Sequence, residues 1–112
     1  MNDSTPIACD LSALDDASRR EHERVAGQVL HSVVEVREED EGYAFRLSAD
    51  IPTIIALGQF IARERLCCPF FDFSLEIPRD HQPVWLHVSG REGVKEYIAA
   101  NMLPLLQNAT GP

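Results

Sequence analysis

The sequence predicts one α+β domain, in which an N-terminal helix is followed by two β-hairpin–helix units. Its 112 residues are close to the usual size of a single domain. Two segments alternate apolar and polar residues around turn-forming stretches, as hairpins do, and three others have apolar residues at helical spacing. We therefore expect one domain over residues 1–112, with flexible ends at 1–6 and 108–112. Its four-stranded antiparallel sheet should carry helices on one face.

The first half of the chain should contain one helix and one hairpin. The stretch from Leu11 to Asp16 leads into a polar, charge-alternating run through Arg24, which is followed by Val25, Ala26, Val29 and Leu30; this predicts a helix ending between residues 28 and 31. Apolar runs at residues 33–36 and 43–47 flank an acidic stretch that ends at Gly42, and this pattern is typical of a hairpin.

The second half repeats the order of helix and hairpin. Asp50 precedes Ile51-Pro52, a common helix start, and the following helix should run to the helix-stopping Pro69. Residues 71–77 and 84–88 alternate as strands do. A final helix should span residues 91–102, with Pro104 limiting its length.

Composition and charge exclude several classes of protein. The formal net charge of −8 would repel a phosphate backbone, so we expect no nucleic-acid partner. No apolar run approaches the roughly 20 residues that cross a bilayer, and residues 1–10 lack the features of a secretory signal, so we expect a cytoplasmic protein without a membrane partner. No phosphate loop, H-E-x-x-H, G-x-S-x-G or dinucleotide motif is present, and we do not predict an enzyme or a catalytic residue.

The adjacent pair Cys67-Cys68 is the unusual chemical feature of the chain. The three cysteines are an odd number and the core looks sufficient without covalent links, so we expect reduced thiols rather than a disulfide framework. On a helix the two side chains of the pair diverge by about 100°, which places Cys68 on the core face and Cys67 at its boundary. Glu64 and Arg65 also fall on the predicted core face, where charges need a partner or a task.

The position of the pair favours a cation. The C-terminal end of a helix carries partial negative charge, which opposes a free thiolate but suits a metal ion that deprotonates its thiol ligands. We therefore predict a soft metal or metalloid site formed by Cys67, Cys68 and Glu64, with Cys9 as a third sulfur if its segment folds back over Pro69. The candidate ions are mercury, zinc, copper(I) and arsenic(III); structural zinc would require a fourth ligand such as a histidine.

Two other interpretations stay open. The cysteines can be packing residues of a non-catalytic module, in which Trp85 and His87 on the uncovered sheet face dock a second copy of the chain or another protein. Alternatively the protein is a thiol redox protein, and a vicinal disulfide between Cys67 and Cys68 would belong to this interpretation. The sequence lacks the C-x-x-C arrangement that is usual in such proteins. His22, His31 and His81 are predicted to be surface residues.

Four segments of the chain share a pattern with other proteins: Ile7-Ala8-Cys9-Asp10-Leu11, Gly42-Tyr43-Ala44-Phe45, Arg63-Glu64-Arg65-Leu66-Cys67-Cys68-Pro69-Phe70-Phe71, and the stretch from Val84-Trp85-Leu86 to Gly90-Arg91-Glu92-Gly93-Val94-Lys95-Glu96. Through these segments most of the chain resembles a group of small uncharacterised bacterial proteins. Similar E-x-x-CCPF segments accompany regulators of the mercury-resistance type. The resemblance implies a heavy-metal context and no particular activity.

Overall fold

The computed structural model describes residues 7–110, with side chains described up to Leu106. It confirms the predicted α+β class and the order of an N-terminal helix followed by hairpin–helix units. The predicted flexible ends at 1–6 and 111–112 lie outside the described residues, and 108–110 belong to the last helix. The prediction of one domain over the whole chain stays a prediction.

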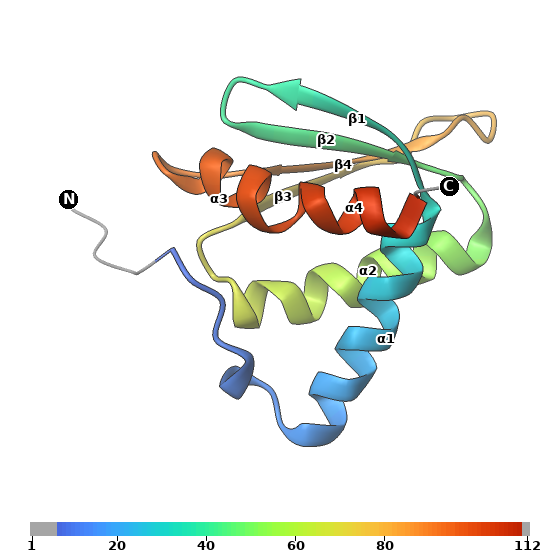
Figure 1. The fold of residues 1–112 in the computed structure, drawn as a ribbon. Helices are drawn as coiled ribbons and strands as arrows, with labels where there is room; N and C mark the ends of the chain where they lie inside the picture. The colour runs from blue at the N-terminus through green and yellow to red at the C-terminus, as the bar shows by residue number, and fades with distance from the viewer. Residues whose placement is uncertain (1–6, 111–112) are drawn as a thin grey trace.

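Four antiparallel strands form one sheet in the order β1-β2-β4-β3. They are β1 (Val33–Glu39), β2 (Gly42–Leu47), β3 (Asp72–Glu76) and β4 (Val84–Ser89). Val84, Leu86 and Val88 alternate inward along β4 and are buried, because they face the helices that lie beneath the sheet in Figure 1. The two hairpins therefore meet through their second strands, and β1 and β3 form the sheet edges.

Helices α1 (Asp16–Ser32) and α2 (Ile51–Cys67) pack against each other below the sheet (Figure 1). Each begins at an aspartate whose side chain accepts a hydrogen bond from a backbone N–H: Asp15 from Ser18 and Asp50 from Thr53, both at 2.8 Å. Before α1, a short 3-10 helix, η1 (Leu11–Ala13), reverses the chain. These caps fix where both helices start, and hence which residues reach their far ends.

The predicted core face of α2 is rotated from the observed one. Its buried residues are Thr53, Ala56, Leu57, Phe60 and Cys67. Arg65, which helical spacing in the sequence placed on the core face, is exposed. Three closely spaced large apolar residues at 54, 55 and 57 made the sequence pattern ambiguous. Packing against α1 selects the face of Leu57 and Phe60, so Cys67, seven residues after Phe60, is buried rather than at the boundary.

The C-terminal region contains two short helices: the first lies inside the predicted span of 91–102, and the second was not predicted. α3 (Val94–Asn101) begins after Gly93, whose φ of +97° is a left-handed conformation, and α4 (Leu103–Thr110) follows directly. Pro104 sits in the first turn of α4, where a helix needs no backbone N–H, so it starts a helix as readily as it stops one.

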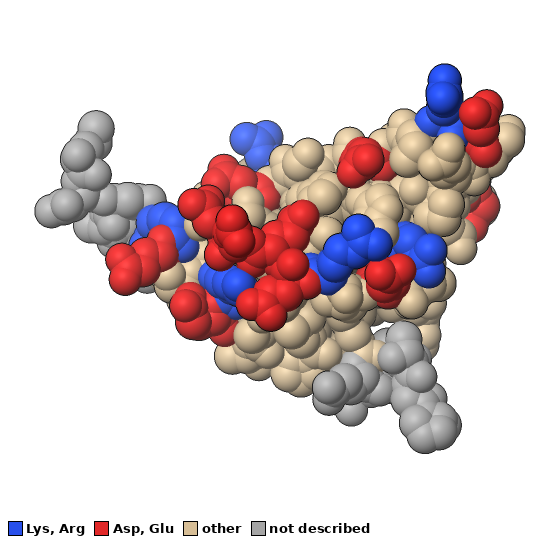
Figure 2. Space-filling view, turned by 90° about the horizontal axis from the view of Figure 1, so that it is seen from above, with Lys and Arg blue, Asp and Glu red and all other residues tan. Residues whose placement is uncertain are grey.

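The sheet face opposite the helices carries an intramolecular network of charges. The guanidinium of Arg37 lies 4.4 Å from the ring centroid of Trp85. His87 bonds Glu39 through Nδ1 at 3.0 Å and Glu76 through Nε2 at 3.2 Å. The hydrogen bond with Glu39 is the main cause of a raised pKa at His87. Figure 2 shows acidic and basic residues intermixed on this side of the molecule.

This network bears on the idea that the face docks a partner. Trp85 and His87 lie on the uncovered face, as expected, but both are already engaged by neighbouring charged side chains. A partner would have to compete with those contacts. The homodimer and the protein-interaction module stay predictions without structural support.

Candidate functional site at the end of α2

The end of α2 is where the predicted site residues gather. Cys67 is the last residue of the helix, and Cys68 is its C-cap, with a backbone N–H that donates to the carbonyl oxygen of Glu64 at 2.7 Å. Cys68 has φ −127° and ψ 71°, so the backbone leaves helical geometry just before Pro69. This departure is the break that the sequence predicted, and it turns Cys68 away from the regular helical spacing.

The segment before α1 folds back over this break. The N–H of Asp10 donates to the carbonyl oxygen of Cys67 at 2.7 Å, and the segment runs past the end of α2 in Figure 1. Ile7 packs against the core beside Gly93, where an added Cβ would lie only 2.8 Å from its Cδ1 atom. Two contacts on either side of Cys9 therefore hold it over the end of the helix.

Cys9 and Cys68 form a disulfide, with their Cα atoms 4.5 Å apart. The prediction of three reduced thiols is therefore wrong for these two residues, and the alternative of a vicinal Cys67–Cys68 bond is wrong as well. The sulfurs meet because the segment around Cys9 docks on α2 from 59 positions away in the sequence. No spacing rule along the chain reveals that contact.

Cys67 does not share the site of its neighbour. Its thiol is free and only 1% of the residue is exposed. Burial is the main cause of a raised pKa at this thiol, and the charges of Glu64 and Asp10 raise it further. Cys67 thus has the character of a small packing residue, which is the role the sequence left open for it.

Glu64 links the disulfide to the interior of the protein. Its Oε1 lies 3.2 Å from Sγ of Cys68, and its Oε2 lies 2.6 Å from Nε2 of His22 on α1. The side chains of Glu64 and His22 are only 14% and 6% exposed. The carboxylate that sequence analysis assigned to the site is therefore half of a nearly buried polar pair.

His22 is a site residue that sequence analysis placed at the surface, and that prediction is wrong. It is buried, and its ring stacks on Phe60 at 5.6 Å between centroids. Within the described part of the chain its Nδ1 is buried without a hydrogen-bond partner. The signal that could have found it is its spacing, because His22 precedes the buried Val25 and Val29 by three and seven residues.

Tyr97 is a second residue that sequence analysis did not assign to the site. Its hydroxyl donates to Sγ of Cys9 at 3.1 Å, from helix α3. The ring of Tyr97 lies edge-on to Phe70, 5.2 Å between centroids, so apolar packing holds the hydroxyl in place. The exposed sulfur thus has a polar donor with a fixed position.

Cys9, Glu64 and Cys68 together form a cluster of ligand atoms. One atom from each, two sulfurs and a carboxylate oxygen, lie within 4.8 Å of one another. Among the described residues, these three side chains are the cysteine, histidine or acidic group that is compact enough to hold a metal ion. Once the disulfide is reduced, the cluster has two sulfur ligands and one carboxylate close enough together to bind the same ion.

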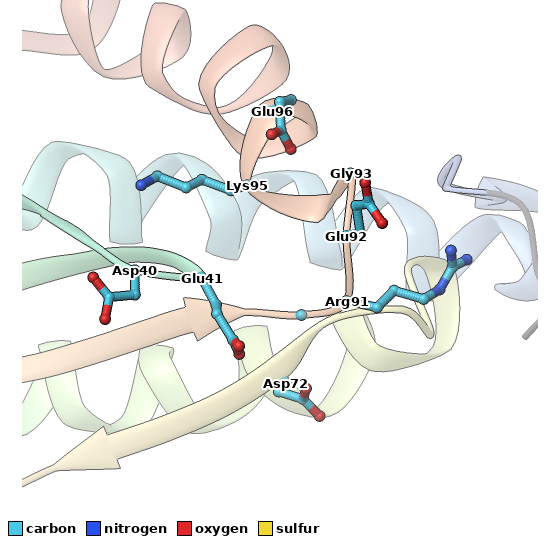
Figure 3. A pocket seen from close by; sticks show the side chains of 9 residues that line it. Asp40, Glu41, Asp72, Arg91, Glu92, Gly93, Lys95 and Glu96 are labelled. Atoms are coloured by element: carbon cyan, nitrogen blue, oxygen red, sulfur yellow. The ribbon is translucent and has the colours of Figure 1, made fainter.

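An acidic hollow of about 530 Å³ lies elsewhere on the surface. Its lining includes Asp40, Glu41, Asp72, Glu92 and Glu96, together with two cations. Figure 3 shows these side chains spread around the hollow rather than converging on one point. None of the predicted site residues lines it, and we assign it no function.

Comparison with known proteins gives this chain no family. Neither protein-family models, nor curated proteins, nor solved structures gave a match to it. Over the described residues, no helix is both long and apolar enough to span a bilayer. The chemistry at the end of α2 is therefore the basis on which a function can be assigned.

Proposed function

We propose that the protein binds a soft metal or metalloid ion through the thiolates of Cys9 and Cys68, with the carboxylate of Glu64 as a third ligand. The observation that carries the proposal is the convergence of these three ligand atoms within 4.8 Å. The site forms in a reducing compartment such as the cytoplasm, where the Cys9–Cys68 bond is opened and both sulfurs are available.

The ligand set discriminates among the four candidate ions. Two sulfurs and one oxygen favour a thiophilic ion of low coordination number, so mercury(II) and copper(I) fit best. Structural zinc takes four ligands and arsenic(III) takes three thiolates, whereas the cluster holds two cysteines and one carboxylate. We therefore expect the site to bind zinc and arsenic(III) more weakly than mercury(II) and copper(I).

His22 supports the site without binding the ion. Its Nε2 bonds Glu64 at 2.6 Å, on the carboxylate oxygen that does not touch Cys68. Such outer partners fix the orientation of a ligand and keep it in place when the ion leaves. A histidine in this position explains why a carboxylate is kept in a nearly buried place beside two sulfurs.

The test is ion stoichiometry measured by native mass spectrometry under anaerobic, reducing conditions. Wild-type protein should retain one mercury(II) or one copper(I) per chain, and Cys9→Ser and Cys68→Ser should each lose most of that binding. Cys67→Ser is the matched control, because it removes a neighbouring sulfur that lies outside the cluster. If Cys67→Ser abolished binding while Cys9→Ser and Cys68→Ser retained it, the proposed ligand set would be wrong.

A further inference from the structure

The geometry points to a second activity of the same two sulfurs: Cys9 and Cys68 form an exchangeable redox pair that reacts with low-molecular-weight thiols. In this reaction the incoming sulfur attacks Cys9, and Cys68 is the leaving group. The activity goes beyond ion binding and does not require an ion.

The unequal access of the two sulfurs sets the direction of attack. Cys9 is exposed, whereas Cys68 is only 1% exposed. Thiol–disulfide exchange needs the attacking sulfur to approach in line with the bond that breaks, so the attacked sulfur must have an open side. A small thiol can therefore reach Cys9 from solvent but not Cys68 through the core.

The reaction balances as two exchanges. First, a thiol RSH attacks Sγ of Cys9: the R–S–S–Cys9 bond forms, the Cys9–Cys68 bond breaks, and the electron pair and the thiol proton end on Cys68. Second, another RSH attacks the mixed disulfide, releasing RSSR and leaving Cys9 as a thiol. The protein is reduced by two electrons and the small thiol is oxidised to its disulfide.

The site has polar partners for both released sulfurs. A protonated Cys68 can donate to Oε1 of Glu64, which lies 3.2 Å from its sulfur. The hydroxyl of Tyr97 donates to Sγ of Cys9 at 3.1 Å and would stabilise its thiolate in the reverse reaction. Because these contacts already exist in the disulfide form, the pair can open and close with little rearrangement around it.

Cys67 takes no part in the exchange. It is free, only 1% exposed and outside the cluster, so a small thiol cannot reach it from solvent. The mixed disulfide on Cys9 is thus resolved by Cys68, which restores the original bond, or by a second external thiol. The chain uses one exposed and one buried sulfur in place of a C-x-x-C pair.

The first experiment treats air-oxidised, ion-free wild-type protein with reduced glutathione in the presence of a chelator, followed by acid quenching and peptide mapping. Glutathione should appear on Cys9, and Cys68 should appear as a free thiol in the same molecules. An adduct on Cys68 would overturn the direction of attack. A Cys9–Cys68 bond that persists in the folded protein, while the urea-unfolded protein is reduced, would overturn the activity itself.

A second experiment compares single cysteine variants and does not require the disulfide. Cys68→Ser leaves the exposed sulfur and Cys9→Ser leaves the buried one, so oxidised glutathione should modify the first at least about tenfold faster than the second. Cys67→Ser should react like wild type. Equal rates for Cys68→Ser and Cys9→Ser in folded protein, checked by circular dichroism, would contradict the proposal.

These results are separable from the outcome of the ion experiment. Glutathione exchange at Cys9 without ion retention would leave the redox pair standing and remove the proposed function. If the reduced protein retained an ion but glutathione could not open the disulfide, the proposed function would stand and the exchangeable redox pair would be excluded.

Discussion

Nε2 of His22 on α1 lies 2.6 Å from Oε2 of Glu64 on α2, which joins the two helices through a nearly buried polar pair. Buried polar groups are costly unless they bond each other, so each residue makes the burial of the other acceptable. The pair also aims the second carboxylate oxygen of Glu64 at Cys68. Glu64 therefore belongs both to the interface between α1 and α2 and to the cluster around Cys68.

Glu64→Gln should weaken ion binding while the fold persists. Glutamine keeps the shape of the side chain but replaces a charged ligand by a neutral amide, so we expect affinity for mercury(II) or copper(I) to fall by about 10-fold to 100-fold. Competition against a chelator of known affinity measures the change. Glu23→Gln, at an exposed position on α1, is the control and should bind like wild type.

Tyr97→Phe should lower the reactivity of reduced Cys9. The substitution removes the hydroxyl that donates to Sγ but keeps the ring against Phe70. Loss of one hydrogen bond to a thiolate corresponds to a rate about tenfold lower at fixed pH. Alkylation followed by mass spectrometry measures it, and an unchanged rate at Cys9 would show that the hydroxyl does not act on the sulfur.

Cys67 should resist modification in the folded protein. Its thiol is buried, so in protein whose Cys9–Cys68 bond has been reduced, iodoacetamide should label Cys9, and Cys68 more slowly, before it labels Cys67. Labelling of the reduced protein in urea should reach all three cysteines. Rapid labelling of Cys67 under native conditions would mean that the end of α2 opens readily.

Reduction should lower the stability of the protein. A bond across a sequence separation of 59 residues restricts the unfolded chain, which corresponds to about 4 kcal/mol of unfolding free energy in the chain-entropy treatment. Urea unfolding with and without a reducing agent gives the difference. Cys9→Ser should be insensitive to the reducing agent, whereas Cys67→Ser, which keeps the bond, should respond like wild type.

The sheet face predicts a pH dependence that is independent of the sulfurs. Hydrogen bonding to Glu39, and then to Glu76, raises the pKa of His87 above the value of about 6.5 expected in the unfolded chain. The folded state therefore holds this proton more tightly, so the stabilisation is fully present below the unfolded pKa and is lost as pH rises through the folded pKa.

His87→Gln should remove that part of the pH dependence. Urea unfolding at a series of pH values between about 5 and 9 measures it in wild type and variant. His81→Gln, in the exposed turn between β3 and β4, is the control and should keep the wild-type profile. Identical profiles for wild type and His87→Gln would contradict the role assigned to the two glutamates.

Local patterns in the sequence were sufficient for most of the fold. The alternation in 84–88 and the position of Asp50 before Ile51-Pro52 depend on neighbouring residues, and they predict β4 and the start of α2. Pro104 shows the limit of such signals, because proline is compatible with the end of one helix and with the first turn of another.

The candidate site was predictable only in part. Glu64 and the break at Pro69 followed from helical spacing, and Cys9 was expected to join them if its segment folded back. The disulfide, the burial of His22 and the contact from Tyr97 depend on segments far apart in the chain. Tertiary packing decides such contacts, and no periodicity within one element encodes them.

The exposed sulfur belongs to a short segment at the rim of the core, whereas its buried partner belongs to the helix that builds the core. Cys9 lies among exposed residues, held by the hydrogen bond from Asp10 to Cys67 and by its bond to Cys68. In a reducing compartment, where the Cys9–Cys68 bond is already open, a substitution at Cys9 can therefore silence the proposed site in a protein that still folds and accumulates, while damage at the end of α2 would reduce abundance as well. Loss of activity and loss of protein are thus separable failures in this chain, and a screen that measures both would tell them apart.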